Sequence, residues 1–192
     1  MIGVEILDLR WYADCMYDAA KENKQFWNYL SQTQKDLILE GRYLMYEVIK
    51  DHAYQFKDYS FLVFPFAKAY EGFLKQLFKD VKFISHLDYI SDHYRLGKML
   101  SPNLVEKLGD RSLYLKIKNT TSQEIADRIW QGWKMGRNQI FHYFSHNTKA
   151  VTFAYAEVII EELFKIMEDA FVKLLSMHIC KKLGEYNKPI VT

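Results

Sequence analysis

Apolar side chains recur every three or four residues along most of the chain, which is the spacing of one face of an α-helix. Only three prolines and eight glycines interrupt this pattern among the 192 residues. The pattern predicts long helices at residues 34–55, 61–84 and 150–183. Between residues 86 and 118 the periodicity weakens, and turn residues indicate one or two short helices. We therefore expect an all-α fold.

The expected helices differ in their ends and in their faces. A further helix is predicted to begin at Thr121, because its hydroxyl and the carboxylate of Glu124 form a capping-box pattern. The helix at 61–84 is apolar around most of its circumference, which is typical of the central helix of a bundle. Its polar strip consists of Lys68, Lys75 and Lys79, with Glu71 at the border. The last helix spans about 45–50 Å at 1.5 Å per residue, so we expect part of it to pack on a partner.

Length and composition favour one globular domain. The chain is 49% hydrophobic and 16% aromatic, which is enough material for a core. We expect an extra N-terminal arm, residues 1–33, to pack on a helical domain at 34–192. The formal net charge is only +2, so any surface that binds nucleic acid must be a local patch.

Cysteine usage and the N-terminal sequence indicate a cytoplasmic protein. The two cysteines, Cys15 and Cys180, are far apart and form no CxxC pair, which favours a reducing compartment. The first eight residues carry acids where a signal peptide has a basic start. The longest apolar run, at 61–67, is too short to cross a bilayer. We expect no membrane partner.

The segment from Arg137 to His142 carries the clearest chemical signal. It places a permanent cation, the amide of Asn138 and an imidazole within six residues. Arginine binds phosphate through paired hydrogen bonds and histidine transfers protons near neutral pH, so these groups can break a phosphodiester without a metal. Residues five apart on an ideal helix diverge by about 140°. We therefore expect either that Gly136 breaks the helix or that a two-fold homodimer brings two such segments together.

Cations alternate with aromatic rings in the residues before Arg137. Trp130, Trp133 and Lys134 fall on helical positions next to it, and Arg128 comes before them. Cations that hold phosphate and flat rings that stack on bases are typical of proteins that bind single-stranded RNA. Arg128, Trp130 and Lys134 are therefore candidate substrate-binding residues. The alternative places the tryptophans in the core, and it is favoured for Trp133.

A metal site at the histidines is the weaker alternative. His142 and His146 are four residues apart, a spacing found in metal sites, but no cysteine or HExxH glutamate accompanies them. No glycine-rich phosphate loop and no serine nucleophile motif is present either. We expect a site with no metal and no other cofactor.

An all-helical domain with the motif Arg-Asn-x-x-x-His near its last two helices resembles the HEPN superfamily of ribonucleases, many of which are toxins or phage-defence effectors. Within it, the chain is most similar to the catalytic domain of RNase LS type toxins. The resemblance covers residues 34–180, and its only sharp motif runs from Arg137 to His142. Those toxins pair the motif with a glutamate on an earlier helix, and Glu71 occupies that place. The alternative for Glu71 is a simple ion pair with Lys75, four residues on.

The resemblance implies a metal-independent endoribonuclease that cleaves single-stranded RNA by attack of the ribose 2′-hydroxyl on the phosphate. His142 would be the general base or acid, and Arg137 would neutralise the developing charge. Asn138 would orient the phosphate or the imidazole. Glu71 would fix the histidine tautomer or be a second proton-transfer group. The implied partners are RNA, a second copy of the chain and a protein antitoxin.

The tyrosine next to His142 departs from the pattern of one HEPN branch. A HEPN branch that pairs with nucleotidyltransferase antitoxins carries Arg-x4-His-x-Tyr, but here the tyrosine, Tyr143, stands one place early. This departure argues against regulation by modification of that tyrosine.

The alternative function is a non-catalytic HEPN-like module that binds RNA or protein and uses Arg137 and His142 in a dimer interface.

Overall fold

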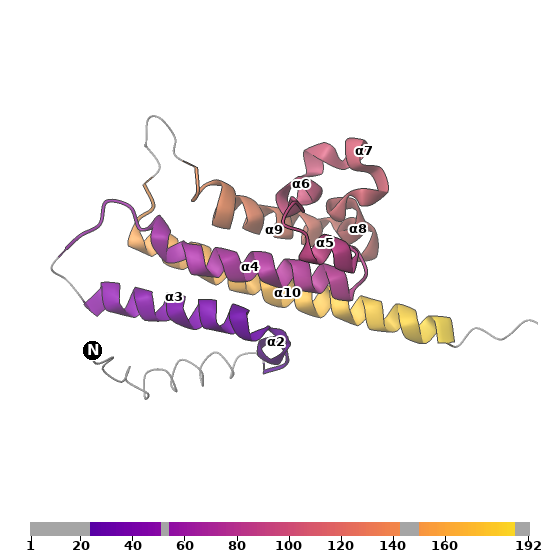
Figure 1. The fold of residues 1–192 in the computed structure, drawn as a ribbon, viewed down its shortest axis with the longest axis horizontal. Helices are drawn as coiled ribbons and strands as arrows, with labels where there is room; N and C mark the ends of the chain where they lie inside the picture. Colours follow the sequence, from indigo (N-terminus) through magenta and orange to yellow (C-terminus); the bar gives the residue numbers. More distant parts are fainter. Residues whose placement is uncertain (1–23, 51–53, 143–149, 187–192) are drawn as a thin grey trace, which may run out of the picture.

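The computed structural model describes residues 24–50, 54–142 and 150–186, and every regular element in these ranges is helical (Figure 1). This confirms the all-α prediction. The longer helices are α2 (Lys24–Tyr29), α3 (Gln32–Lys50), α4 (Ser60–Asp80), α8 (Leu113–Thr120), α9 (Gln123–Trp133) and α10 (Phe153–Tyr186). The shorter ones are α5 (His86–Ile90), α6 (Leu96–Leu100), η1 (Pro102–Leu104), α7 (Val105–Leu108), η2 (Gly109–Arg111) and η3 (Lys134–Asn138).

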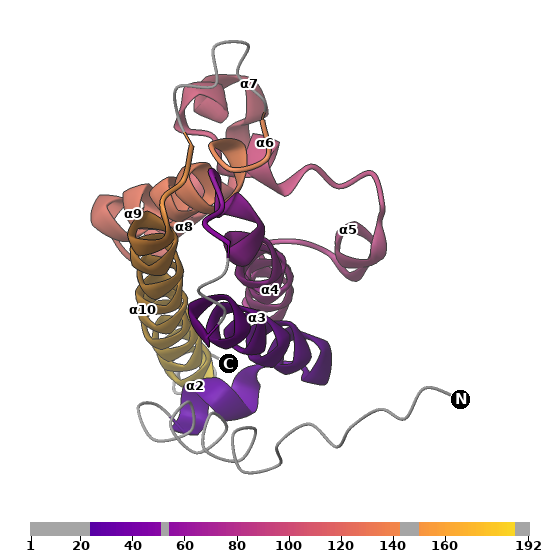
Figure 2. The ribbon, with the colours of Figure 1, turned by 90° about the vertical axis from the view of Figure 1, so that its left-hand side faces the viewer.

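Helix α4 lies at the centre of the fold. It packs along α3 on one side and α10 on another, and η3 contacts it near its middle (Figures 1 and 2). Its side chains Phe73, Leu74, Leu77 and Phe78 are completely buried. The helix is central because it is apolar around most of its circumference and can cover several neighbours at once.

The bounds of the predicted helices differ from those observed. Helix α3 is Gln32–Lys50 where 34–55 was expected, and α10 is Phe153–Tyr186 where 150–183 was expected. The helix expected at 61–84 ends at Asp80, and Lys82 follows with φ 61°, a left-handed conformation that turns the chain. Ser122, not Thr121, caps α9: its hydroxyl accepts a hydrogen bond from the Ile125 N–H at 3.3 Å. The Thr121 hydroxyl instead donates to the Ile117 carbonyl at 2.9 Å and so belongs to the end of α8.

The described part of the expected N-terminal arm contributes to the core. Phe26, Trp27 and Leu30 are buried, and the Phe26 ring lies 5.7 Å from that of Phe73 and 5.8 Å from that of Phe171. Helix α2 thus joins α4 to α10, and α3 begins at Gln32, two residues before the expected boundary at 34. Residues 1–23 of the arm lie outside the described residues.

The crossing of α4 and α9 is fixed by close contacts. The Tyr70 hydroxyl donates to the Ile129 carbonyl at 2.8 Å, and complete burial raises the pKa of this hydroxyl. Gly132 faces the same tyrosine, and a Cβ there would lie 2.8 Å from the Tyr70 oxygen. Because these contacts hold α9 against α4, they also determine where the residues after Trp133 meet Glu71, the neighbour of Tyr70.

Candidate functional site

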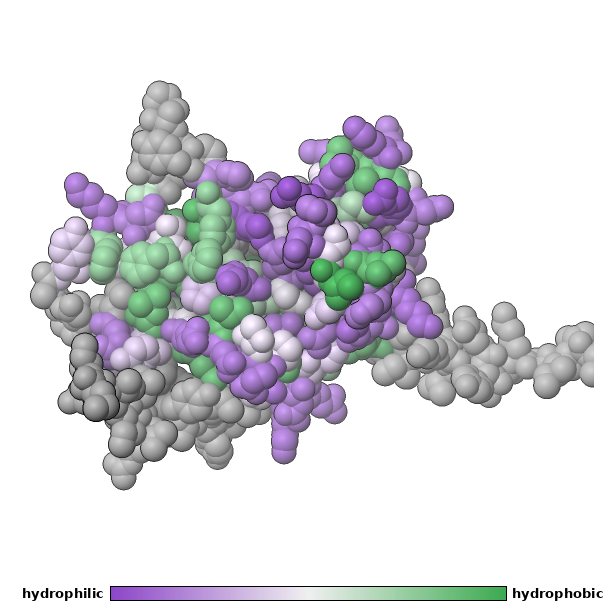
Figure 3. All heavy atoms as spheres, in the orientation of Figure 1, coloured by the Kyte–Doolittle hydropathy of each residue, from purple (hydrophilic) through white to green (hydrophobic). Residues whose placement is uncertain are grey.

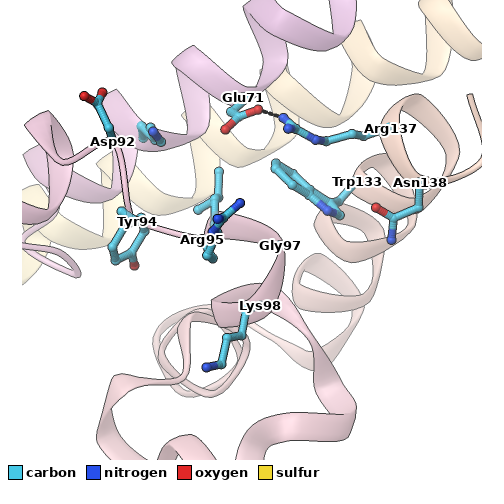
Figure 4. A pocket seen from close by; sticks show the side chains of 11 residues that line it. Glu71, Asp92, Tyr94, Arg95, Gly97, Lys98, Trp133, Arg137 and Asn138 are labelled. Atoms are coloured by element: carbon cyan, nitrogen blue, oxygen red, sulfur yellow. Dashed lines mark ion pairs between the residues drawn. The ribbon is translucent and has the colours of Figure 1, made fainter. Parts of the chain in front are cut away.

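Glu71 on α4 and Arg137 in η3 point toward each other and form an ion pair between Oε2 and Nη1 (Figure 4). The Arg137 side chain is 48% exposed and that of Glu71 is 24% exposed, so the pair lies at the surface and water reaches it. No ion pair joins Glu71 to Lys75. The structure therefore favours the contact between helices over the local alternative.

The backbone at Arg137 is a π-helical turn. Helix α9 ends at Trp133, and the chain continues as η3, in which the Gln139 N–H donates to the Lys134 carbonyl at 3.0 Å, five residues back. Such turns recur at functional sites because they redirect the side chains that follow. Gly136 does not break the helix here. It is buried, and a Cβ at this position would lie 3.0 Å from Leu163 of α10, so glycine allows η3 to approach α10 closely.

Trp133 supports the guanidinium of Arg137. The Arg137 Cζ lies 5.1 Å from the centre of the Trp133 ring, a cation–π contact, and Figure 4 shows the ring beside the guanidinium. Trp133 is only 6% exposed, which agrees with the core interpretation of this residue. Gly97 of α6 permits the packing, because a Cβ there would lie 2.3 Å from the indole nitrogen. Glu71 of α4 and Trp133 of α9 thus hold Arg137 in place, and Gly97 of α6 allows Trp133 to pack there.

A polar cavity of about 340 Å³ opens beside the ion pair (Figure 4). Its lining residues come from α4, from η3 with the preceding turn of α9, and from the segment that ends in α6: Glu71, Lys75, Asp92, Tyr94, Arg95, Leu96, Gly97, Lys98, Trp133, Arg137 and Asn138. Four of these side chains are cations and two are carboxylates. Lys75, Arg95 and Lys98 take part in no ion pair within the described residues. Such a cavity can bind an anion with several phosphate oxygens.

His142 lies outside this cavity. Its side chain is exposed and lines neither the polar cavity nor the apolar one described below. The residue before it, Phe141, packs on Phe64 of α4 with ring centres 5.2 Å apart, which anchors the chain just before His142. Within one chain, Glu71 and Arg137 meet and Asn138 lines the cavity beside them, whereas His142 does not. His146 and Tyr143 lie outside the described residues.

The candidate substrate-binding residues, two in α9 and one at the start of η3, also lie outside the two cavities. Arg128 forms an ion pair with Asp169 of α10, and Trp130 and Lys134 are half-buried; none of the three lines either cavity. Arg128 stands nine residues before Arg137, so on an ideal helix the two side chains would point in directions about 180° apart. Arg95 and Lys98 line the polar cavity but were not predicted from the sequence, because they come from the segment of weak periodicity. Their only local signal is the pair of cations around Gly97.

Metal and membrane features are absent from the part of the chain that the structure describes. No three His, Cys, Asp or Glu side chains gather there closely enough to hold a metal ion. No helix among these residues is long and apolar enough to span a membrane. Comparison with protein-family models, with curated proteins and with solved structures finds no match.

Proposed function

We propose that this chain is a HEPN-like, metal-independent endoribonuclease that cleaves single-stranded RNA. The observation that carries the proposal is the meeting of Glu71 with Arg137 beside a cation-rich cavity that Asn138 also lines. Arginine has five N–H donors, so the guanidinium can hold Glu71 and still present donors to a phosphate. The other cations of the cavity suit the neighbouring phosphates of an RNA strand.

In the proposed reaction the ribose 2′-oxygen attacks the adjacent phosphorus and the bond from phosphorus to the 5′-oxygen breaks. The 2′-hydroxyl gives up its proton to a base, and the leaving 5′-oxygen receives one, so the products are a 2′,3′-cyclic phosphate and a 5′-hydroxyl. His142 serves as the base or the acid. Arg137 neutralises the charge that grows on the phosphorane oxygens, and Asn138 orients the phosphate. Glu71 acts by holding the guanidinium, since its contact is with Arg137 and not with an imidazole.

The position of His142 favours a site completed by a second copy. In the proposed homodimer two Arg137–His142 segments face each other across a two-fold axis, so that each imidazole reaches the phosphate held by the other copy. In the cell the enzyme acts as a cytoplasmic toxin or phage-defence effector that a protein antitoxin neutralises. Light scattering on the active protein tests the dimer, and a monomer that still cleaves RNA would contradict it.

The test of the reaction is cleavage of RNA by purified protein in excess EDTA. Cleavage should persist and give cyclic-phosphate and 5′-hydroxyl ends, and Arg137→Ala should remove it. Lys173→Ala is the matched control, because this exposed cation of α10 lines neither cavity. Cleavage that requires Mg²⁺ or Mn²⁺, or products with 3′-hydroxyls, would refute the mechanism.

A second candidate is a non-catalytic module that binds RNA or protein. The exposure of His142 outside both cavities favours it, because binding through Arg137 needs no imidazole nearby. Expression in a bacterium separates the two candidates. A nuclease toxin should arrest growth and its Arg137→Ala variant should not, whereas a binding module should give the same growth in both cases.

A further inference from the structure

A second cavity, of about 320 Å³, lies next to the ion pair toward the beginning of α4. Its walls are two phenylalanines, Phe64 and Phe141, together with Ala67, and its charged residues are Lys68, Glu71 and Arg137. Apolar side chains gather on this end of the molecule, where α4 begins (Figure 3). Because Glu71 and Arg137 line both cavities, the ion pair separates an apolar cavity from a polar one.

The two phenylalanines that line this cavity are exposed although their side chains are large. Phe64 is 46% exposed and Phe141 is 43% exposed, although their ring centres lie 5.2 Å apart at 56°. Each of the two residues therefore keeps exposed surface at the cavity. Lys68 stands over the Phe64 ring, with its ammonium nitrogen 5.6 Å from the ring centre. An aromatic wall bordered by cations is the chemistry that stacks on a flat, polarisable ring.

The charged residues at the cavity specify what kind of ring fits. Lys68 and Arg137 can donate hydrogen bonds and Glu71 can accept them, so the edge of the bound ring must carry both acceptors and donors. A nucleobase has such an edge and two π-faces. An aliphatic side chain has neither, and a phenylalanine ring has the faces but no donors or acceptors at its edge. A base within a duplex is stacked on its neighbours, so only an unpaired base can enter.

We infer that the apolar cavity between Phe64 and Phe141 is a nucleobase subsite, which holds one unpaired base next to the phosphate bound by Arg137. The inference rests on the proposed function and deepens it, because it names the part of the single strand that the protein grips beside the phosphate. It also gives the stacking role expected of Trp130 to two exposed phenylalanines that adjoin the guanidinium.

Binding of an RNA that cannot be cleaved tests the subsite. An oligonucleotide with 2′-O-methyl groups throughout lacks the attacking hydroxyl, so its affinity reports contacts and not catalysis. Phe64→Ala and Phe141→Ala should each weaken its binding on the order of 10-fold to 100-fold, the range found for loss of a base-stacking ring. Phe141→Tyr should keep the affinity, because the ring remains. Tyr155→Ala is the matched control: this ring is 45% exposed and lines neither cavity.

Removing the base itself provides the decisive comparison. A series of oligonucleotides should be made, each lacking the base at a different position of the strand. One of them should bind the unchanged protein more weakly than the intact oligonucleotide does. Phe141→Ala should bind that oligonucleotide no more weakly than the unchanged protein does, because the stacking contact is already lost with the base. A fluorescent 2-aminopurine at the same position should be quenched by the unchanged protein and not by Phe141→Ala.

The possible results separate the subsite from the proposed function. If RNA is cleaved but the phenylalanine variants bind the oligonucleotide normally, the subsite is wrong and the nuclease proposal stands. If the variants lose binding as expected but the unchanged protein cleaves no RNA, the subsite stands and the nuclease proposal fails. If Phe64→Ala and Phe141→Ala convert a dimer to a monomer in light scattering with no loss of affinity, the rings form an interface between two copies and the subsite is refuted.

Discussion

Replacing Arg137 with alanine should remove most cleavage while costing the fold little stability. The ion pair with Glu71 lies at the surface, with side chains 48% and 24% exposed, so it contributes about 0.2–1 kcal/mol. The cation–π contact with Trp133 adds about 0.5–1 kcal/mol. Together the loss is about 1–2 kcal/mol, which lowers Tm by roughly 2–8 °C in a chain of 192 residues.

The expected effect on activity is much larger than the effect on stability. A donor that stabilises charge only in the transition state contributes on the order of 10²–10³ in kcat. Arg137→Lys should recover part of the rate, since it restores the charge without the paired hydrogen bonds. Glu71→Gln should reduce the rate less than Arg137→Ala, because it loosens the guanidinium and leaves it present.

Both quantities should be measured on the same preparations: kcat/KM with a fluorogenic RNA, and Tm by circular dichroism. A lost rate in a protein that remains folded at the assay temperature supports the catalytic role. The reasoning is refuted if Arg137→Ala keeps its activity, or if its rate falls only in proportion to the fraction unfolded. Full activity in Glu71→Gln would remove Glu71 from the site and leave Arg137 in it.

Three further predictions concern other parts of the site and fold. His142→Ala should reduce cleavage on the order of 10²-fold or more without changing Tm, because the side chain is exposed; full activity would end the nuclease proposal. Gly97→Ala should cost about 1–3 kcal/mol in urea unfolding and should reduce cleavage, because its Cβ would overlap the Trp133 indole; unchanged stability would contradict this packing. Burial and the hydrogen bond to Asp127 raise the pKa of Tyr114 to about 12. The protonated Tyr114 hydroxyl therefore stabilises the fold below about pH 10, and this stabilisation is lost as the pH rises toward 12. In urea titrations Tyr114→Phe should lose less stability over that pH range than the unchanged protein does.

The local patterns in the sequence sufficed for the long helices but not for residues 86–118. One or two short helices were expected there, and the structure has α5, α6, α7, most of α8 and the two short turns η1 and η2, because a weak period does not separate short helices from turns. Apolar spacing predicted an all-α fold, and the apolar circumference of α4 predicted its central place, because helical periodicity depends on neighbours in sequence. The start of α9 was displaced by one residue because Thr121 and Ser122 both carry a capping hydroxyl. The structure distinguishes them because the Thr121 hydroxyl bonds to the end of α8, which leaves the Ser122 hydroxyl to cap α9.

The partner of Glu71 could not be decided from the sequence alone. Lys75 is available four residues away on any helix, so a local ion pair always fits the pattern. The contact with Arg137 depends on how α9 crosses α4, which the hydrogen bond from Tyr70 and the close approach at Gly132 determine. The family resemblance pointed to Glu71, but the contact itself is a tertiary one.

The cavities were likewise set by the tertiary structure. Phe64 belongs to an apolar helix and has the sequence signature of a core residue, yet the packing of α3 and α10 leaves its side of α4 uncovered. Arg95 and Lys98 come from a segment without clear periodicity, and they reach the site only because Gly97 fits against Trp133. The sequence by itself predicted the long helices and pointed to the segment from Arg137 to His142 as the candidate for phosphate chemistry. The tertiary structure decided which cations and rings surround that segment, because such contacts form between helices and leave no period in the sequence.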